Sequence, residues 1–400
     1  MKLLKRAVAF KVPPTEGTLT ETYEHLIPGA NIPGGVQSAG KLMDATSKLS
    51  LAIAAFLGLG VGASCSLGSL ESELGPSGPR PAPGHAAGGR IAFIAQADPG
   101  DSWSRALYVM NPDGSDAKPL DQHVTGPIAW SPDATMIAYS HATDHEAGIY
   151  VAEPESGRVT RLTSTSGWDG YPAWSPDGTK IAFVHNHCTL RVADLAKCAW
   201  RSMSRVSGRV DSHAWTPDSR YVYFRGEDAG TKRRFFDVVY SDWFLYRVDI
   251  LTGSQERVTE DQGLEAGPSP DGSRLALILD RRDDRALFLA NPDGSNLQPL
   301  PIAGYRPQGI SWAPQGDRLL VEALPSDERS GLVGASLFVI EIGNKSTRRL
   351  AEKGVGWGSP SWSPDGTKVL YERSGKLAVY DLKAENEAVS REGSYPRWSP

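Results

Sequence analysis

The chain of 400 residues is long enough to bury a substantial core, and its formal net charge of −5 is mild for that length. Lys and Arg are scattered along it, which excludes a nucleic-acid footprint and a basic face for membrane lipids. The three cysteines show no paired C-x-x-C spacing, so a disulfide-dense fold and a zinc finger are excluded as well.

An apolar run near the N-terminus has the features of an export signal. It covers residues 49–63, LSLAIAAFLGLGVGA, and carries no charge. The run is shorter than the roughly 20 residues that a membrane span needs, but it suits the core of a signal peptide. The small residues that lead to Cys65 resemble the lipobox of bacterial lipoproteins, although Gly62 stands where that motif usually has Leu. We predict that residues 1–65 are an extension plus a signal peptide or membrane anchor, with Cys65 as the lipidation site; a buried apolar helix is the alternative.

Two further stretches flank this signal. Residues 1–42 precede it. Either translation starts at Met43, or residues 1–42 form a cytoplasmic extension, and the sequence is compatible with both. Residues 66–88 are rich in Pro, Gly and Ala, a composition that cannot build a core, and are predicted to be a flexible linker. The remainder, residues 89–400, is therefore expected outside the cytoplasm, tethered to the membrane of a bacterium.

From residue 89 onward one pattern returns six times and begins a seventh time. The copies are PIAWSPDATMIAY (127–139), PAWSPDGTKIAF (172–183), HAWTPDSRYVYF (213–224), GPSPDGSRLALI (267–278), ISWAPQGDRLLV (310–321), PSWSPDGTKVLY (360–371) and, at the end, PRWSP (396–400). Their spacing lies in the range of β-propeller blades, roughly 40 to 50 residues.

Each copy predicts four short antiparallel strands. Ser-Pro-Asp-Gly is a tight turn, because Pro pre-sets φ, Asp binds its own backbone and Gly tolerates positive φ. The flanking apolar runs form a hairpin around this turn, and a third and a fourth strand follow, as in GIYVAE (148–153) and RVTRLT (158–163). A blade of this kind cannot bury both faces alone, whereas stacking the blades in a ring can.

The core P-x-W-S-P-D-G-x-x-I-A-F, followed by an I-Y-V-like strand and R-L-T, resembles the TolB-like, WD40-like, PD40-type β-propeller repeat. The resemblance covers about three-quarters of the chain and implies an all-β propeller over residues 89–400. We expect seven blades, where TolB has six, and no separate α/β domain ahead of them. GRIAFIAQ (89–96) lacks its W-S-P strand and YPRWSP (395–400) is such a strand alone, so the C-terminal strand is predicted to complete the first blade and close the ring.

Histidines gather in the loops between second and third strands and between blades, on one rim. Imidazoles with carboxylates can bind manganese or zinc, and His-Asn-His at 185–187 would project two rings to one side of a strand. Oligogalacturonate lyases are similar in repeat type and hold manganese with histidines on such a face. A metal or catalytic site, a ligand-binding surface and solvated loops are the alternatives. The candidate metal ligands are His141, His145, His185 and His187, and the candidate binding residues of this rim are Trp168, Asp169 and His213.

The longest insertion, residues 226–242, is expected to be an exposed basic and aromatic loop on the same rim. Arg and aromatic residues are favoured anchors in protein interfaces. The candidate contacts to a partner are Arg233, Arg234, Phe235 and Phe236, and the alternative is that the phenylalanines pack under the loop.

No catalytic signature accompanies the repeat. G-x-S-x-G, H-E-x-x-H and G-x-x-x-x-G-K are missing from the sequence. The sequence does not decide whether Cys188 and Cys198 form a disulfide. The prediction is a monomeric, membrane-tethered scaffold that binds a protein or glycan of the cell envelope, without nucleic acid and with no required cofactor. The alternative is a metal-dependent enzyme, such as a polysaccharide lyase of the oligogalacturonate type.

Overall fold

The computed structural model describes residues 89–98, 104–143, 147–163, 167–197, 199–206, 208–235, 238–281, 284–327, 334–356 and 360–400. All of them belong to the second of the two units into which the chain divides, Gly58–Pro400. Within these ranges every regular element is a strand, and no helix capable of crossing a membrane is found. The predicted signal, Cys65 and the linker 66–88 lie outside the described residues.

The described residues form 28 strands, which group by fours along the chain. We name the groups blades 1 to 7. Blade 1 combines the last strand with the first three: β28 (Ser394–Trp398), β1 (Ile91–Gln96), β2 (Arg105–Met110) and β3 (Lys118–Gln122). Blade 2 is β4 (Val124–Trp130), β5 (Ile137–Ala142), β6 (Ala147–Ala152) and β7 (Val159–Arg161); blade 3 is β8 (Asp169–Trp174), β9 (Lys180–His185), β10 (Thr189–Asp194) and β11 (Ala199–Ser202).

The other four blades follow in order. Blade 4 is β12 (Val210–Trp215), β13 (Tyr221–Phe235), β14 (Val238–Asp249) and β15 (Gln255–Arg257); blade 5 is β16 (Gln262–Pro268), β17 (Leu275–Arg281), β18 (Asp284–Ala290) and β19 (Gln298–Pro299). Blade 6 is β20 (Tyr305–Trp312), β21 (Arg318–Pro325), β22 (Ala335–Glu341) and β23 (Thr347–Val355); blade 7 is β24 (Ser361–Trp362), β25 (Lys368–Arg373), β26 (Lys376–Asp381) and β27 (Asn386–Glu392).

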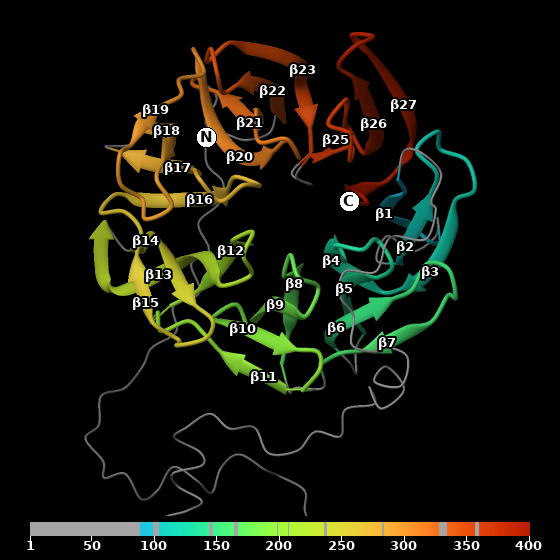
Figure 1. The fold of residues 1–400 in the computed structure, drawn as a ribbon, viewed down its shortest axis with the longest axis horizontal. Helices are drawn as coiled ribbons and strands as arrows, with labels where there is room; N and C mark the ends of the chain where they lie inside the picture. The colour runs from blue at the N-terminus through green and yellow to red at the C-terminus, as the bar shows by residue number, and fades with distance from the viewer. Residues whose placement is uncertain are drawn as a thin grey trace, which may run out of the picture. The chain divides into compact units, whose positions relative to one another are not determined.

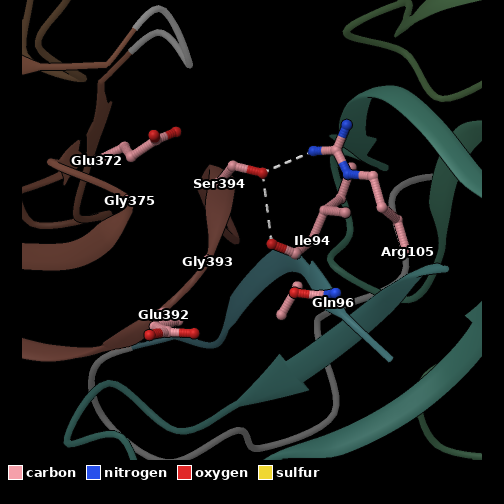
Figure 2. Close-up of a pocket in the computed structure, with 9 residues that line it drawn as sticks. Ile94, Gln96, Arg105, Glu372, Gly375, Glu392, Gly393 and Ser394 are labelled. Atoms are coloured by element: carbon pink, nitrogen blue, oxygen red, sulfur yellow. Dashed lines mark hydrogen bonds between the residues drawn. The ribbon is translucent and has the colours of Figure 1, made fainter. Parts of the chain in front are cut away.

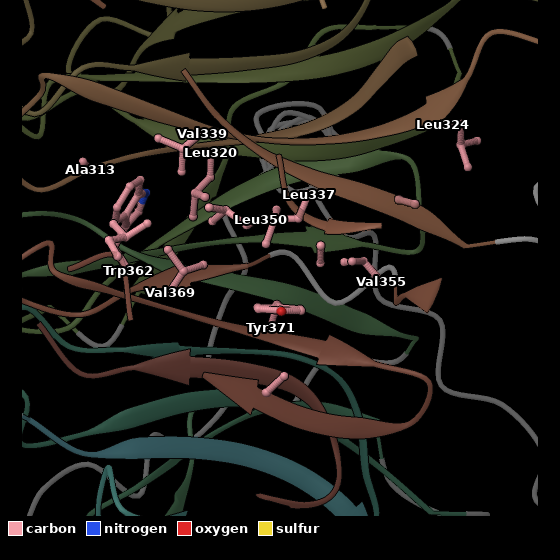
Figure 3. Packing of buried hydrophobic residues seen from close by; sticks show 14 residues of the cluster. Ala313, Leu320, Leu324, Leu337, Val339, Leu350, Val355, Trp362, Val369 and Tyr371 are labelled. Atoms are coloured by element: carbon pink, nitrogen blue, oxygen red, sulfur yellow. The ribbon is translucent and has the colours of Figure 1, made fainter. Parts of the chain in front are cut away.

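The sheets stand around a common centre, with the first strand of each blade innermost and the fourth outermost (Figure 1). Five sheets have four antiparallel strands each, and blades 6 and 7 share one eight-stranded sheet through the single residue pair Val355 and Arg373. Clusters of buried side chains lie between neighbouring blades, and the cluster of Trp362, Leu337 and Tyr371 joins blades 6 and 7 (Figure 3). The all-β propeller prediction is therefore confirmed.

The Ser-Pro-Asp-Gly turns have the hydrogen bonds that the sequence predicts. In blade 3, Ser175 Oγ donates to Asp177 Oδ1 at 2.6 Å and accepts from the Lys180 N–H at 2.9 Å. The same carboxylate oxygen accepts from the Thr179 N–H at 3.0 Å, and Gly178 has a φ of 70°. A turn satisfied in this way fixes the register of the first two strands of a blade.

The repeated tryptophans join each blade to the one before it. The indole N–H of Trp174 donates to the Ala129 carbonyl at 3.2 Å, and that of Trp215 donates to the Ala173 carbonyl at 3.1 Å. The same bond recurs from Trp130 to the Arg397 carbonyl, from Trp312 to Gly267 and from Trp362 to Ser311. Pro268, which replaces the tryptophan of blade 5, has no such donor. The tryptophans are thus packing residues that also hydrogen-bond across blade boundaries.

Replacing Trp174 with Phe is expected to lower the free energy of unfolding by about 1–3 kcal/mol. The substitution keeps an apolar ring but leaves the Ala129 carbonyl without its donor and opens a small void. Urea denaturation of W174F beside L251A measures the effect. Leu251 is 69% exposed in the turn after β14, so its change should stay within about 0.5 kcal/mol. Equal losses in the two variants would contradict the role of the indole bond.

The terminal strand β28 completes the sheet of β1, β2 and β3. Ile91 pairs with Trp398 and Ala92 with Arg397, and the Arg90 N–H donates to Ser399 Oγ at 2.8 Å. Figure 1 shows the end of the chain beside β1, on the inner side of blade 1. This pairing is the arrangement that the sequence predicts, while seven blades and ring closure stay predictions for the protein in solution.

One sequence expectation about the insertion at 226–242 is wrong. It is not a loop, because β13 and β14 extend as a long hairpin through most of this stretch, with Arg233 paired to Tyr240 and Phe235 to Val238. Alternating residues with good strand propensity, VVYSDWFLY, continue the ladder beyond the usual blade height. The side chains of Arg233, Arg234 and Phe235 and the whole of Phe236 lie outside the described parts.

Candidate functional site

One end of the ring carries most of the residues predicted to be functional. We call it the 2–3 end, since the second strand of each blade finishes there and the third begins. Antiparallel pairing also places the start of each inner strand and the end of each outer strand at this end. Asp169 begins β8, His185 ends β9 and His141 lies one residue before the end of β5. The structure thus has these three residues at the same end of their strands, and their role as site residues stays a prediction.

Asp169 and His185 form a hydrogen-bonded pair in blade 3. The His185 Nδ1 atom lies 2.7 Å from Asp169 Oδ1, the Asp169 side chain is fully buried, and the two residues are cross-strand partners. Nε2 of His185 is 3.1 Å from the Asn186 side-chain nitrogen. The carboxylate therefore fixes the ring orientation and directs Nε2 toward the surface of the rim.

An aromatic platform lies beside this pair and consists of Trp168, His187 and Tyr171. The His187 ring stacks on Trp168 with centroids 4.1 Å apart, and Tyr171 meets Trp168 edge-on at 5.5 Å. The backbone N–H of Trp168 donates to Asn186 Oδ1 at 2.8 Å, and this bond holds the hairpin turn against the start of β8. Tyr171 is 39% exposed and His187 is exposed, while Trp168 is half-buried against the core, so the platform presents the Tyr171 and His187 rings to solvent.

The geometry of this turn corrects the expectation for His-Asn-His. β9 ends at His185, and Asn186 and His187 have φ values of 48° and 57°, which a tight hairpin turn of the I′ type requires. The two histidines therefore do not project to one side of a strand. His185 turns to Asp169, and His187 lies on Trp168.

His141 occupies the equivalent place in blade 2. Its Nδ1 lies 3.2 Å from Asp121 Oδ2, which also accepts from the Tyr139 hydroxyl at 2.6 Å. The His141 ring stacks on Tyr150 with centroids 4.5 Å apart, and His123 approaches it edge-on. Each of the two histidines is thus oriented by a carboxylate, His185 by Asp169 of its own blade and His141 by Asp121 of the neighbouring blade 1.

The predicted metal site is only partly described. Among the described residues, no group of three or more His, Cys, Asp and Glu side chains is placed to hold a metal ion. His145 lies outside these residues, so a site that includes it stays a prediction. Cys188, in the turn before β10, is exposed and its thiol is free, while Cys198 lies outside the described residues.

His213 lies elsewhere than expected. The sequence predicts it in a segment between blades, but it is the fourth residue of β12. Both ring nitrogens are buried without a hydrogen-bond partner, and burial lowers the pKa of His213 to about 4. Its ring is therefore neutral near pH 7, and the residue lies half-buried within an inner strand.

The inner strands carry an irregularity that sequence analysis missed. In blades 1 to 6 the register between the inner and the second strand shifts within two or three residues, as at Tyr171, Ser212 and Tyr395, all of which have positive φ. Such a bulge changes the direction of a side chain relative to the regular pleat. In the sequence, a proline or a small residue before the tryptophan motif was the feature that could have indicated this register shift.

A bulged strand also carries an arginine–aromatic contact in blade 4. Arg225 donates to Asp211 at 3.2 Å and to the Gly263 carbonyl at 3.1 Å, and its guanidinium stacks over Trp243 at 4.2 Å. Burial raises the pKa of Asp211, and Arg225 opposes that shift. The contact therefore ties the second and third strands of blade 4 to its inner strand and to blade 5.

Two glutamates in the interior were also missed. A Cβ atom at Gly309 would lie 2.8 Å from Glu322 Oε2 and 3.7 Å from Glu265 Oε2, so the carboxylates converge on one point. Oε1 of Glu322 is buried without a partner, whereas Glu265 Oε2 accepts from the Ile310 N–H at 3.2 Å. Burial raises the pKa of both to about 8, the charge of Glu265 adds to the shift of Glu322, and Arg397 opposes both shifts. A single Glu inside the apolar run RLLVEAL was the signal in the sequence.

Comparison with known proteins supports the fold and the repeat type. Residues 85–243 match the family model described as the TolB beta propeller domain, PD40. The uncharacterized protein Atu1656 of Agrobacterium fabrum is 27% identical over 168 residues, which are 40% of this chain and 54% of that protein. The chain thus spans about half the length of this curated relative.

Solved propellers resemble the structure at low identity. An oligogalacturonate lyase from Vibrio parahaemolyticus has a TM-score of 0.56 at 15% identity, over 76% of this chain and 87% of that one. An oligogalacturonate lyase in complex with manganese has a TM-score of 0.55 at 18% identity, over 77% and 86% of the two chains. The β-propeller domain of the Trilobed protease from Pyrococcus furiosus has a TM-score of 0.54 at 15% identity, over 75% and 91%.

At these identities the likeness to solved structures shows the fold alone. The family match adds the repeat type for blades 1 to 3 and part of blade 4. The repeated motif, the ring of sheets and the family match over residues 85–243 agree on a β-propeller whose repeats are similar to the TolB-like, PD40-type repeat.

Proposed function

We propose that this protein is an extracytoplasmic, membrane-tethered scaffold that binds a protein of the cell envelope at the 2–3 end. The observation that carries the proposal is the platform of Trp168, His187 and Tyr171, an exposed and ordered aromatic surface. Trp, Tyr and Arg are the residues that contribute most to protein interfaces, particularly where they are held rigid before binding. The apolar run 49–63 and Cys65 supply the expected export and tether.

The hydrogen bonds around the platform favour binding over catalysis. The carboxylate of Asp169 fixes His185, and the amide of Asn186 fixes both Trp168 and the turn, so the surface is rigid before a partner arrives. Arg225 stacked on Trp243 is a second arginine–aromatic contact, in blade 4. A glycan of the envelope is the second class of ligand that such a surface accepts.

A photo-crosslinking residue at Tyr171 is expected to trap one envelope protein in living cells. The matched control carries the same residue at Leu251, which is 69% exposed in the turn after β14, at the opposite end. Mass spectrometry should identify the same partner from Tyr171 in independent preparations and none from Leu251. Trp168→Ala in the crosslinking variant should reduce the trapped product at least tenfold.

Other results would reject the proposal. Equal products from both positions, or a product that survives Trp168→Ala, would mean that the platform does not select a partner. A variant that traps no protein but loses glycan binding on Trp168→Ala would assign the platform to a glycan instead.

A further inference from the structure

A cavity of about 220 Å³ opens between blades 7 and 1, away from the aromatic platform. Its walls come from the end of β1, the start of β2, the turn between β25 and β26 and the segment that joins β27 to β28. Arg105 and Ser394 line it on the blade 1 side, and Glu372 and Gly375 line it on the blade 7 side. These positions place the cavity at the 2–3 end.

The two walls carry opposite charges that do not pair with each other. Figure 2 shows Arg105 and Glu372 on opposite sides, with Ser394 between them. Arg105 Nη2 donates to Ser394 Oγ at 2.7 Å, and its guanidinium lies 5.5 Å from the centre of the Tyr395 ring. Its other two nitrogens have no hydrogen-bond partner among the described residues. A half-buried guanidinium with free donors is suited to a carboxylate.

The opposite wall presents an acceptor without a donor. Among the described residues, the Glu372 carboxylate has neither a hydrogen bond nor an ion pair within 4 Å, although the side chain is half-buried. Burial raises the pKa of Glu372, and Arg105 across the cavity opposes that shift. Glu322, deeper in the ring, feels the negative charge of Glu372. This wall therefore favours a positively charged group.

The shape of the site allows a ligand to reach both groups. Gly375, in the turn, has a φ of 79° and no atom within 4 Å of the place where a Cβ would lie, so the rim above Glu372 stays open. Ser394 is held by Arg105 and lies 3.5 Å from the Ile94 carbonyl, which fixes the guanidinium. Neutral hydroxyl groups of a sugar would leave both charges half-buried and uncompensated, whereas a ligand with both charges satisfies each wall.

We propose that this cavity binds the zwitterionic head of a free amino acid, with the carboxylate on Arg105 and the ammonium group on Glu372. The site lies on blades 1 and 7, whereas the aromatic platform lies on blade 3. Its occupant would contact blade 1 and blade 7 together.

The probe is L-leucine, titrated into the full chain in detergent and followed by ligand-observed NMR and by the melting temperature. N-acetyl-L-leucine lacks the positive charge and L-leucinamide lacks the negative one. We expect L-leucine to bind at least tenfold more tightly than either analogue. Glu372→Gln and Arg105→Gln should each weaken it at least tenfold, with the unliganded melting temperature of E372Q unchanged because Glu372 has no structural partner.

The matched controls are Glu352→Gln and Arg348→Gln, in exposed ion pairs of blade 6, which should bind L-leucine as the wild type does. Equal binding of L-leucine and its two analogues would overturn the proposal. So would undiminished binding by E372Q, or an absence of binding to the wild type at 10 mM L-leucine, a concentration that corresponds to an affinity of roughly 3 kcal/mol.

Discussion

Removal of residues 394–400 is expected to lower the melting temperature by on the order of 10 °C and to broaden the transition. The deletion takes away Trp398, which is 6% exposed against the first blade, and leaves β1 as an unpaired edge. It also removes the carbonyl of Arg397, which accepts the Trp130 indole N–H at 3.2 Å, and so loosens blade 2. Loss of a buried tryptophan alone costs about 3–5 kcal/mol.

Two further variants separate closure from a general effect of shortening. Trp398→Ala keeps the strand but removes its buried ring, and it should lower the melting temperature by about half as much as the deletion does. Deleting Pro400 alone, an exposed residue beyond β28, should leave the melting temperature within about 1 °C. A deletion of 394–400 that melts with the wild type would show that the ring is not closed by this strand.

Replacing Glu322 with Gln is expected to stabilise the protein at pH 8 and to leave its stability near pH 4.5 almost unchanged. Burial raises the folded-state pKa of Glu322 from 4.5 to about 8, so the folded protein holds this proton more tightly than the unfolded chain. The stability contributed by the proton is complete below about pH 4.5 and is lost as the pH rises to about 8. At pH 8 the difference from E322Q should be a few kcal/mol, because one pKa unit is worth about 1.4 kcal/mol.

Urea denaturation of both proteins from pH 5 to 8.5 measures the effect. His213 also makes the stability depend on pH, but both proteins contain it, so its contribution cancels in the comparison with E322Q. Because its pKa is lowered to about 4, that contribution has the opposite sign and is lost only as the pH falls from about 6.5 to about 4. Glu385→Gln, an exposed partner of Arg348, is the control and should follow the wild type. Parallel curves for the wild type and E322Q would mean that Glu322 is ionised in the folded protein throughout.

The fold could be predicted because its determinants are local and repeated. Each Ser-Pro-Asp-Gly segment specifies its own turn, as Ser175, Asp177 and Gly178 show, and each flanking tryptophan marks an inner strand. Even the pairing of β28 with β1 followed from two incomplete repeats at the ends of the pattern. Six copies of one signal make single errors in it unimportant.

The site was less predictable because it depends on irregular backbone and on distant contacts. Nothing in His-Asn-His distinguishes a strand from a turn with two positive φ values, and the pairing of His185 with Asp169 depends on register. Glu265 and Glu322 are 57 positions apart in the sequence, and only the ring brings their carboxylates to Gly309. The cavity of Arg105 and Glu372 lies between the first and the last blade, which no local pattern relates.

Blade 1, which combines strands from the two ends of the described chain, has a consequence for biosynthesis. Strands β1, β2 and β3 leave the ribosome first, but β28, which completes their sheet, is made only after the other blades. During that interval the apolar sequence IAFI of β1 has an unpaired edge in a nascent chain. Blade 1 is therefore the first to be synthesised and the last to be completed, because folding cannot finish before residues 394–398 are made. A chaperone that binds β1 during synthesis would protect this edge from aggregation.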